Sequence, residues 1–183
     1  MSKIILISGK AESGKNALAD YIQEKLYQID KTVIIDSFAK YIKDYCNQMG
    51  WNGDKTPYWR EKLQLLGTEI IKEKLNHKAF HAKRLCEDIQ ILNESFDIDY
   101  FLIPDCRFKD EVYTMKSMFP DDCITIRINR IGHKSRLTEE QLKHKSEVDL
   151  DDFDFDYVIN VEGGLNDLYN QADKILDEVI SND

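Results

Sequence analysis

The sequence predicts an α/β protein in which helices flank a parallel sheet. Five short apolar runs bounded by turn-forming residues recur along the 183-residue chain, at 4–7, 33–35, 100–103, 123–128 and 157–159. They lack strict alternation of apolar and polar residues, which is typical of strands buried on both faces of a parallel sheet. Amphipathic helical patterns fill the gaps between these runs. Strands that alternate with helices favour a doubly wound sheet.

The expected helices follow the 3.6-residue period of apolar side chains. They cover residues 18–29, 38–49, 63–70, 77–95, 111–118 and 165–179. In the second of them, Phe38, Ile42, Tyr45 and Met49 form the expected apolar face. A chain of this length fits one domain, 1–183, that is large enough to bury a core.

A glycine loop joins the first expected strand to the first expected helix. Glycines in this position let successive backbone N–H groups surround a polyphosphate, and the helix N-terminus adds its positive end. A lysine at the end of the loop reaches the outer phosphates. The sequence therefore predicts a phosphate-binding loop made of Gly9, Lys10, Ala11, Glu12, Ser13, Gly14, Lys15, Asn16 and Ala17.

The residue after the loop lysine is Asn16, where such loops usually carry the Ser or Thr that ligates Mg²⁺. An amide oxygen can also coordinate Mg²⁺ or hold one of its waters, so Asn16 is a candidate metal ligand. The alternative is that Asn16 only caps or packs.

Ligands of doubly wound sheets bind at the carboxyl ends of the strands, and Asp105 and Arg107 follow the third expected strand. Asp105 could hold Mg²⁺ through water or accept a proton from an attacking group. Its structural alternative is to cap the helix that starts near Phe108. Arg107 can grip a phosphate with its planar guanidinium.

Basic residues gather after the fourth expected strand. Three of the six arginines of the chain, Arg127, Arg130 and Arg136, fall within ten residues. Such a segment in an acidic protein, at the ligand edge of the sheet, indicates a phosphate-clamping lid over about 130–147. A solvated charged loop is the alternative.

The helical insert between the second and third strands, about 37–95, carries Arg60 and Gln64 four residues apart on one helix face. One could bind the phosphate of an acceptor and the other could bind the edge of a base. The alternative is a pair of surface side chains on an amphipathic helix. Trp51 could stack on a base or could serve in packing.

Composition excludes several classes of function. The net charge of −9 argues against general binding of nucleic acid or of anionic membranes, and no apolar run approaches the length of a membrane span. The N-terminal apolar run leads directly into the glycine loop, so it is interpreted as a strand and not as a signal peptide. The four cysteines are scattered without metal-binding spacing, which favours reduced thiols and a cytoplasmic location. The oligomeric state is open, and a homodimer is compatible with the sequence.

Several motifs, and the order in which they occur along the chain, resemble those of the P-loop nucleoside monophosphate kinases. The resemblance is greatest to the deoxynucleoside monophosphate kinases of bacteriophages and some bacteria. The matching residues are Ser8–Asn16, Ser37–Ala39 with Lys43, Arg60 with Leu63–Gln64, Leu66–Glu69, Pro104–Phe108 with Glu111–Val112, His144–Glu147 and Asp156–Asn160. The resemblance implies a three-layer P-loop NTPase fold with a helical acceptor-binding insert and a short lid. In that family an acidic or amide residue commonly follows the loop lysine, whereas Ala17 departs from a frequent hydroxyl residue.

The resemblance also implies an activity, transfer of the γ-phosphoryl group of ATP to a (deoxy)nucleoside monophosphate with Mg²⁺ as cofactor. The implied catalytic residues are Lys15, Asp105, Arg107, Arg130 and Arg136, with Asn16 and Asp105 as metal ligands. Asn160 and Gly163 would contact the adenine. The implied acceptor-binding residues are Ser37, Phe38, Lys43, Trp51, Arg60, Gln64, Arg107, His144 and Glu147.

Two other functions are compatible with these residues. One is a kinase of another small phosphorylated metabolite, such as dephospho-coenzyme A or a sugar phosphate. The other is a nucleotide-binding regulator without activity, which Asn16 and Ala17 would suit. A GTPase is disfavoured, because the guanine-reading N-K-x-D motif is absent from the sequence. All of these functions have small-molecule nucleotides as partners.

Overall fold

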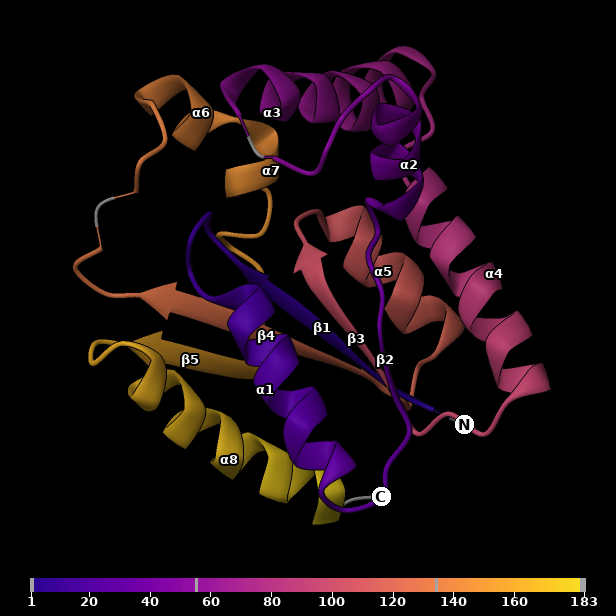
Figure 1. Cartoon of the computed structure of the whole chain (residues 1–183), viewed down its shortest axis with the longest axis vertical. Coiled ribbons are helices and arrows are strands. Elements are labelled where there is room, and N and C mark those ends of the chain that lie inside the picture. Colours follow the sequence, from indigo (N-terminus) through magenta and orange to yellow (C-terminus); the bar gives the residue numbers. More distant parts are fainter. Residues whose placement is uncertain (1, 55, 134, 182–183) are drawn as a thin grey trace.

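The computed structural model describes residues 2–54, 56–133 and 135–181. Its sheet has five strands in the order β2-β3-β1-β4-β5, and every neighbouring pair is parallel (Figure 1). The strands are β1 (Lys3–Gly9), β2 (Val33–Ile35), β3 (Tyr100–Cys106), β4 (Cys123–Arg130) and β5 (Tyr157–Val161). All five predicted strands are confirmed, and the strand that leads into the glycine loop lies at the centre.

Helices cover both faces of the sheet, as predicted (Figure 1). The helices that pack on the sheet are α1 (Lys15–Tyr27), α4 (Phe80–Ser95), α5 (Lys109–Met118) and α8 (Leu165–Ser181). The insert holds α2 (Lys40–Gln48), α3 (Pro57–Gln64) and η1 (Leu65–Lys74). The segment after β4, where a lid is predicted and which keeps that name below, holds α6 (Glu139–Lys143) and α7 (Lys145–Val148).

The central strand shows why the apolar runs do not alternate. Ile5 and Ile7 of β1 belong to the core beneath α1 and α8, whereas Ile4 and Leu6 belong to the core on the α4 and α5 side. Successive side chains of a strand point to opposite faces, so a strand covered on both faces needs apolar residues at every position. All four side chains are at most 1% exposed.

The insert has a small core of its own, built around Ile42, Cys46 and Trp51. The expected apolar face of α2 is partly wrong: Tyr45 and Met49 are more than half exposed, at 54% and 57%. Cys46 is buried instead, because it lies one helical turn after Ile42 and on the same face.

Two features of the insert and the lid were not predicted. The helix that begins at Pro57 continues from Leu65 as a π-helix, η1, through Lys74. The lid contains two short helices, and a reciprocal capping box between Thr138 and Gln141 starts the first of them. Lys134, inside the predicted lid, lies outside the described residues.

The four cysteines are buried free thiols. Among the described residues, no helix combines the length and apolar character needed to cross a membrane.

Candidate phosphate-binding site

The glycine loop between β1 and α1 curls tightly, and two glycines allow it. A Cβ at Gly9 would lie 2.4 Å from the Oγ of Ser13 and 2.8 Å from the carbonyl oxygen of Ile128, so only glycine fits there. Gly14 precedes α1 with a φ of 102°, and Glu12 takes the left-handed conformation with a φ of 63°. The loop is thus a curled backbone segment that ends at a helix N-terminus, as a phosphate cradle requires.

Two buried polar side chains line this loop. The Nζ of Lys15 donates to the carbonyl oxygens of Gly9 at 2.8 Å and of Lys10 at 2.7 Å, and the residue is only 8% exposed. The Oγ of Ser13 is buried and has no hydrogen-bond partner within the described part of the chain. Because buried hydroxyl groups normally find a partner, Ser13 Oγ is a group that a phosphate oxygen could satisfy.

Glu147 of α7 reaches the loop from the other end of the chain. Its Oε2 accepts a hydrogen bond from the backbone N–H of Ala11 at 2.9 Å, and its Oε1 pairs with the guanidinium of Arg107. Glu147 is 7% exposed. The Nζ of Lys10 also holds the carbonyl oxygen of Glu147, and it pairs with Asp151. The structure therefore brings Ala11, Arg107 and Glu147 together, as a carboxylate held between a loop amide and an arginine.

The lid cations gather at Glu12, on the tip of the same loop. Arg130 donates to the carbonyl oxygen of Glu12 at 3.2 Å, and the backbone N–H of Arg136 donates to its carboxylate at 3.3 Å. The ring of His133 lies 3.4 Å from that carboxylate. The hydrogen bond from Arg136, together with the bond from His133, holds the pKa of Glu12 below its usual value. Arg130 thus contacts the glycine loop with its guanidinium, whereas Arg136 bonds to it through the backbone N–H and its side chain is 91% exposed.

Asp105 caps a different segment from the helix near Phe108 that was considered for it. Its carboxylate accepts hydrogen bonds from the Oγ of Ser37 at 2.6 Å and from the backbone N–H groups of Phe38 at 3.0 Å and Ala39 at 3.1 Å. Asp105 therefore caps the segment that leads into α2. The Oγ of Ser37 also accepts from the Nζ of Lys43 at 2.8 Å, so Lys43 completes this cluster.

Glu111 caps the helix after β3 instead. Its Oε2 accepts from the backbone N–H groups of Arg107 at 2.9 Å and of Phe108 at 3.1 Å. The structural alternative considered for Asp105, capping of this helix, is wrong, because the helix takes its capping carboxylate from its own third residue, Glu111.

Three other residues assigned to the acceptor have packing or capping contacts. Phe38 is 3% exposed in the core and Trp51 is 8% exposed in the insert core, so neither ring presents a face to a ligand in this structure. His144 caps α7 by accepting a hydrogen bond from the backbone N–H of Ser146 at 3.2 Å. For Phe38 and Trp51 the structure favours packing over the predicted substrate contact. Arg60 and Gln64 lie on α3 and are partly exposed.

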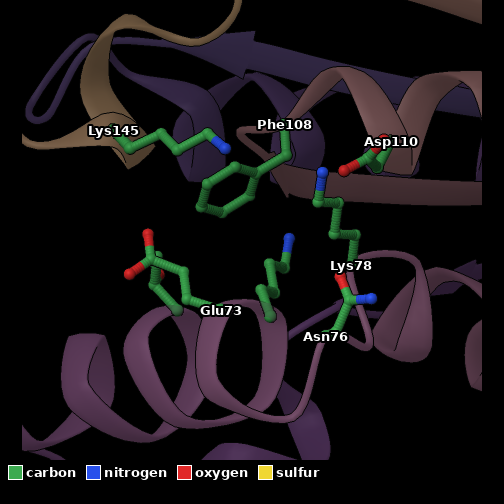
Figure 2. Close-up of a pocket in the computed structure, with 8 residues that line it drawn as sticks. Glu73, Asn76, Lys78, Phe108, Asp110 and Lys145 are labelled. Atoms are coloured by element: carbon green, nitrogen blue, oxygen red, sulfur yellow. The ribbon is translucent and has the colours of Figure 1, made fainter.

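A cavity of about 220 Å³ lies between the insert, the start of α5 and the lid (Figure 2). Inside it, the Nζ of Lys72 lies 2.7 Å from Glu111 and 3.4 Å from the ring centroid of Phe108. Burial raises the pKa of Glu111, and Lys72 opposes that rise. The lining residues are Thr68, Lys72, Glu73, Asn76, Lys78, Phe108, Asp110 and Lys145.

None of these lining residues was predicted to bind the acceptor, although Thr68, Phe108 and Lys145 lie inside the motifs of the resemblance. The position of Phe108, next to Arg107 at the end of β3, is the one signal in the sequence that could have pointed to this cavity.

Three further predicted residues, Asn16, Asn160 and Gly163, are exposed. Asn160 and Gly163, at and after the end of β5, are exposed. Asn16 is exposed in the first turn of α1, and its side chain has no hydrogen-bond partner among the described residues. Its amide oxygen fits a ligand of a phosphate-bound Mg²⁺ better than the carboxylate of Asp105, both oxygens of which accept hydrogen bonds. Residues 2–54, 56–133 and 135–181 contain no cluster of three or more His, Cys, Asp or Glu side chains that could hold a metal alone.

No protein-family model and no curated protein matches the chain. Several solved structures match it. The APS kinase CysC of Mycobacterium tuberculosis in complex with AMPPNP and APS is 11% identical, with a TM-score of 0.55, over 96% of each chain. A sugar kinase from Janibacter sp. is 11% identical, with a TM-score of 0.56, over 97% of this chain and 95% of the other. Shikimate kinase from Acinetobacter baumannii in complex with shikimate is 13% identical, with a TM-score of 0.52, over 100% of this chain and 95% of the other. The chain has the α/β fold of the P-loop kinases, as its glycine loop and parallel strands predict.

Proposed function

We propose that this protein is a kinase that transfers the γ-phosphoryl group of ATP to a (deoxy)nucleoside monophosphate. One observation carries the proposal: Lys15, Arg130 and Arg136 contact the glycine loop, and Arg107 is joined to it through Glu147, although these residues lie far apart in the sequence. A kinase needs this arrangement, because it must neutralise two anionic substrates and the group that passes between them.

In this reaction the loop amides and Lys15 bind the phosphates of ATP. Arg107, at the end of β3, faces the phosphate of the acceptor. Arg130 and Arg136 are exposed here and close over the loop when both substrates are bound, so that the closed lid excludes water that would otherwise hydrolyse ATP. Asn16 would hold Mg²⁺, which when bound would neutralise charge on the phosphates.

The cavity between the insert and the lid supports a small anionic acceptor. Besides Lys72, which is paired with Glu111, two lysines line it, and Lys78 and Lys145 are the groups that could meet the negative charge of an acceptor. One of its lining residues, Phe108, directly follows Arg107 in the sequence. The nucleoside monophosphate as acceptor is supported by the order of the motifs from end to end of the sequence.

A kinase of another small metabolite is the second candidate. The similar solved structures include an APS kinase, a sugar kinase and a shikimate kinase. The same fold thus accommodates acceptors other than nucleoside monophosphates, and the insert decides among them.

Formation of ADP from ATP should be measured with dGMP, dTMP, dCMP, dAMP, the ribonucleotides, dephospho-coenzyme A and sugar phosphates. Lys15→Met should lower turnover by about 10²–10³, the usual loss when one group that stabilises transition-state charge is removed. The matched control is Lys174→Met, which removes an exposed lysine of α8 and should leave turnover unchanged. Binding of ATP without turnover of any acceptor would identify a regulator, and equal turnover in Lys15→Met would overturn the proposal.

A further inference from the structure

We infer that the space filled by the Glu147 carboxylate is a phosphoryl subsite, and that a phosphorylated ligand enters it only by displacing Glu147. This inference rests on the proposed function. It assigns Glu147 a role as an internal competitor of the substrate, in place of the direct acceptor contact that the resemblance implies.

The contacts of Glu147 are those that a phosphoryl group would make. One carboxylate oxygen accepts from the N–H of Ala11 in the glycine loop, and the other pairs with the guanidinium of Arg107. The side chain is 4% exposed. A phosphoryl group also presents oxygens that accept from backbone N–H groups and from a planar guanidinium. The loop amide and the arginine therefore mark one anion position between them.

Two anions cannot share that position. The pair of Arg107 and Glu147 is neutral as it stands, and a second negative group beside a buried carboxylate would meet like-charge repulsion in a site with little water. The phosphoryl group must take the place of Glu147, or else bind without these two donors.

The attachment of α7 allows the carboxylate to leave alone. The Nζ of Lys10 holds the backbone carbonyl oxygen of Glu147, and this contact does not depend on where the side chain points. Two residues earlier, Lys145 reaches from α7 toward the cavity beside Phe108 (Figure 2). The short helix thus carries the competing carboxylate on one residue and a lining group of the cavity on another.

The test is calorimetric binding of ATP and of inorganic tripolyphosphate, measured separately, to the full chain. Glu147→Ala removes the competitor, and Glu147→Gln keeps its shape but not its charge. The matched control is Glu140→Gln, which makes the same charge change at an exposed residue of α6. We expect Glu147→Ala to bind both ligands about tenfold more tightly or better, the equivalent of one charge-assisted hydrogen bond. Glu147→Gln should also gain affinity, and Glu140→Gln should match the wild type.

Affinities of Glu147→Ala and Glu147→Gln equal to that of the wild type would overturn the inference, because no competitor would have been removed. Weaker binding by both variants would also overturn it, because Glu147 would then support the site. If Glu147→Ala does not fold, Glu147→Gln decides alone. Failure of the wild type and of every variant to bind ATP would overturn the proposed function itself, and the inference with it.

Discussion

Protonation of His81 should destabilise this protein, because the ring lies in the seam between the insert and the sheet. His81 is 3% exposed, and neither ring nitrogen has a hydrogen-bond partner within the described residues. Burial and then the charge of Lys72 lower its pKa from 6.5 to about 4, while the carboxylate of Asp105 opposes this shift by less. The native state therefore holds His81 as the neutral imidazole.

The sign of the pH effect follows from where protons bind. Between pH 6.5 and about 4 the unfolded chain takes up a proton at His81 and the native protein does not, so stability falls as the pH falls through this window. With these two pKa values the loss is about 2 kcal/mol at pH 5, and it levels off at about 3 kcal/mol below pH 4. Above pH 6.5 neither state binds a proton at His81, so His81 no longer makes the stability depend on pH.

Urea unfolding followed by circular dichroism, at pH 7.5 and at pH 5, measures this effect against His81→Leu. Leucine has a similar size and no proton to gain, so the variant should gain about 2 kcal/mol relative to the wild type between the two pH values. Carboxylates that titrate in both proteins cancel in this difference. His77→Leu, at an exposed histidine four residues earlier, gives the generic effect of the replacement. A difference between wild type and His81→Leu that stays constant with pH would refute the burial of a neutral His81.

Two further predictions concern the insert. Lys72→Met leaves Glu111 buried without its cation, so the free energy of unfolding in urea should fall by about 3–5 kcal/mol. The double variant Lys72→Met/Glu111→Gln should recover much of this loss, and no recovery would mean that packing of the lysine stem dominates. Arg60→Ala should raise KM for the nucleoside monophosphate far more than KM for ATP, because Arg60 lies on α3 of the insert. Steady-state kinetics measures both constants. A rise in KM for ATP instead would contradict the assignment of the insert to the acceptor.

The sheet could be predicted because its signals are local. A strand buried on both faces needs a continuous apolar run, and each run in the sequence became a strand. The glycine loop could also be predicted from the sequence, since the positive φ at Gly14 favours glycine and the close approach at Gly9 leaves no room for a Cβ. The π-helical stretch η1 was missed, because π-helices are rare and the apolar spacing of residues 63–70 fits the α-helical period.

The partners of the charged residues were decided by tertiary structure alone. The N–H of Ala11 meets a carboxylate 136 positions away, and Asp105 bonds to residues that precede it by 66 to 68 positions. Periodicity reports only which face of an element is apolar, and it cannot report which distant carboxylate a folded loop will accept. The same holds for Phe38 and Trp51, whose aromatic rings suit either a core or a ligand until the packing around them is known. The sequence by itself determined the strands, the order of the motifs and the glycine loop, because each depends on neighbours within a few residues. Which acid pairs with which cation at that loop is decided only by the tertiary structure, because the partners lie far apart in the sequence.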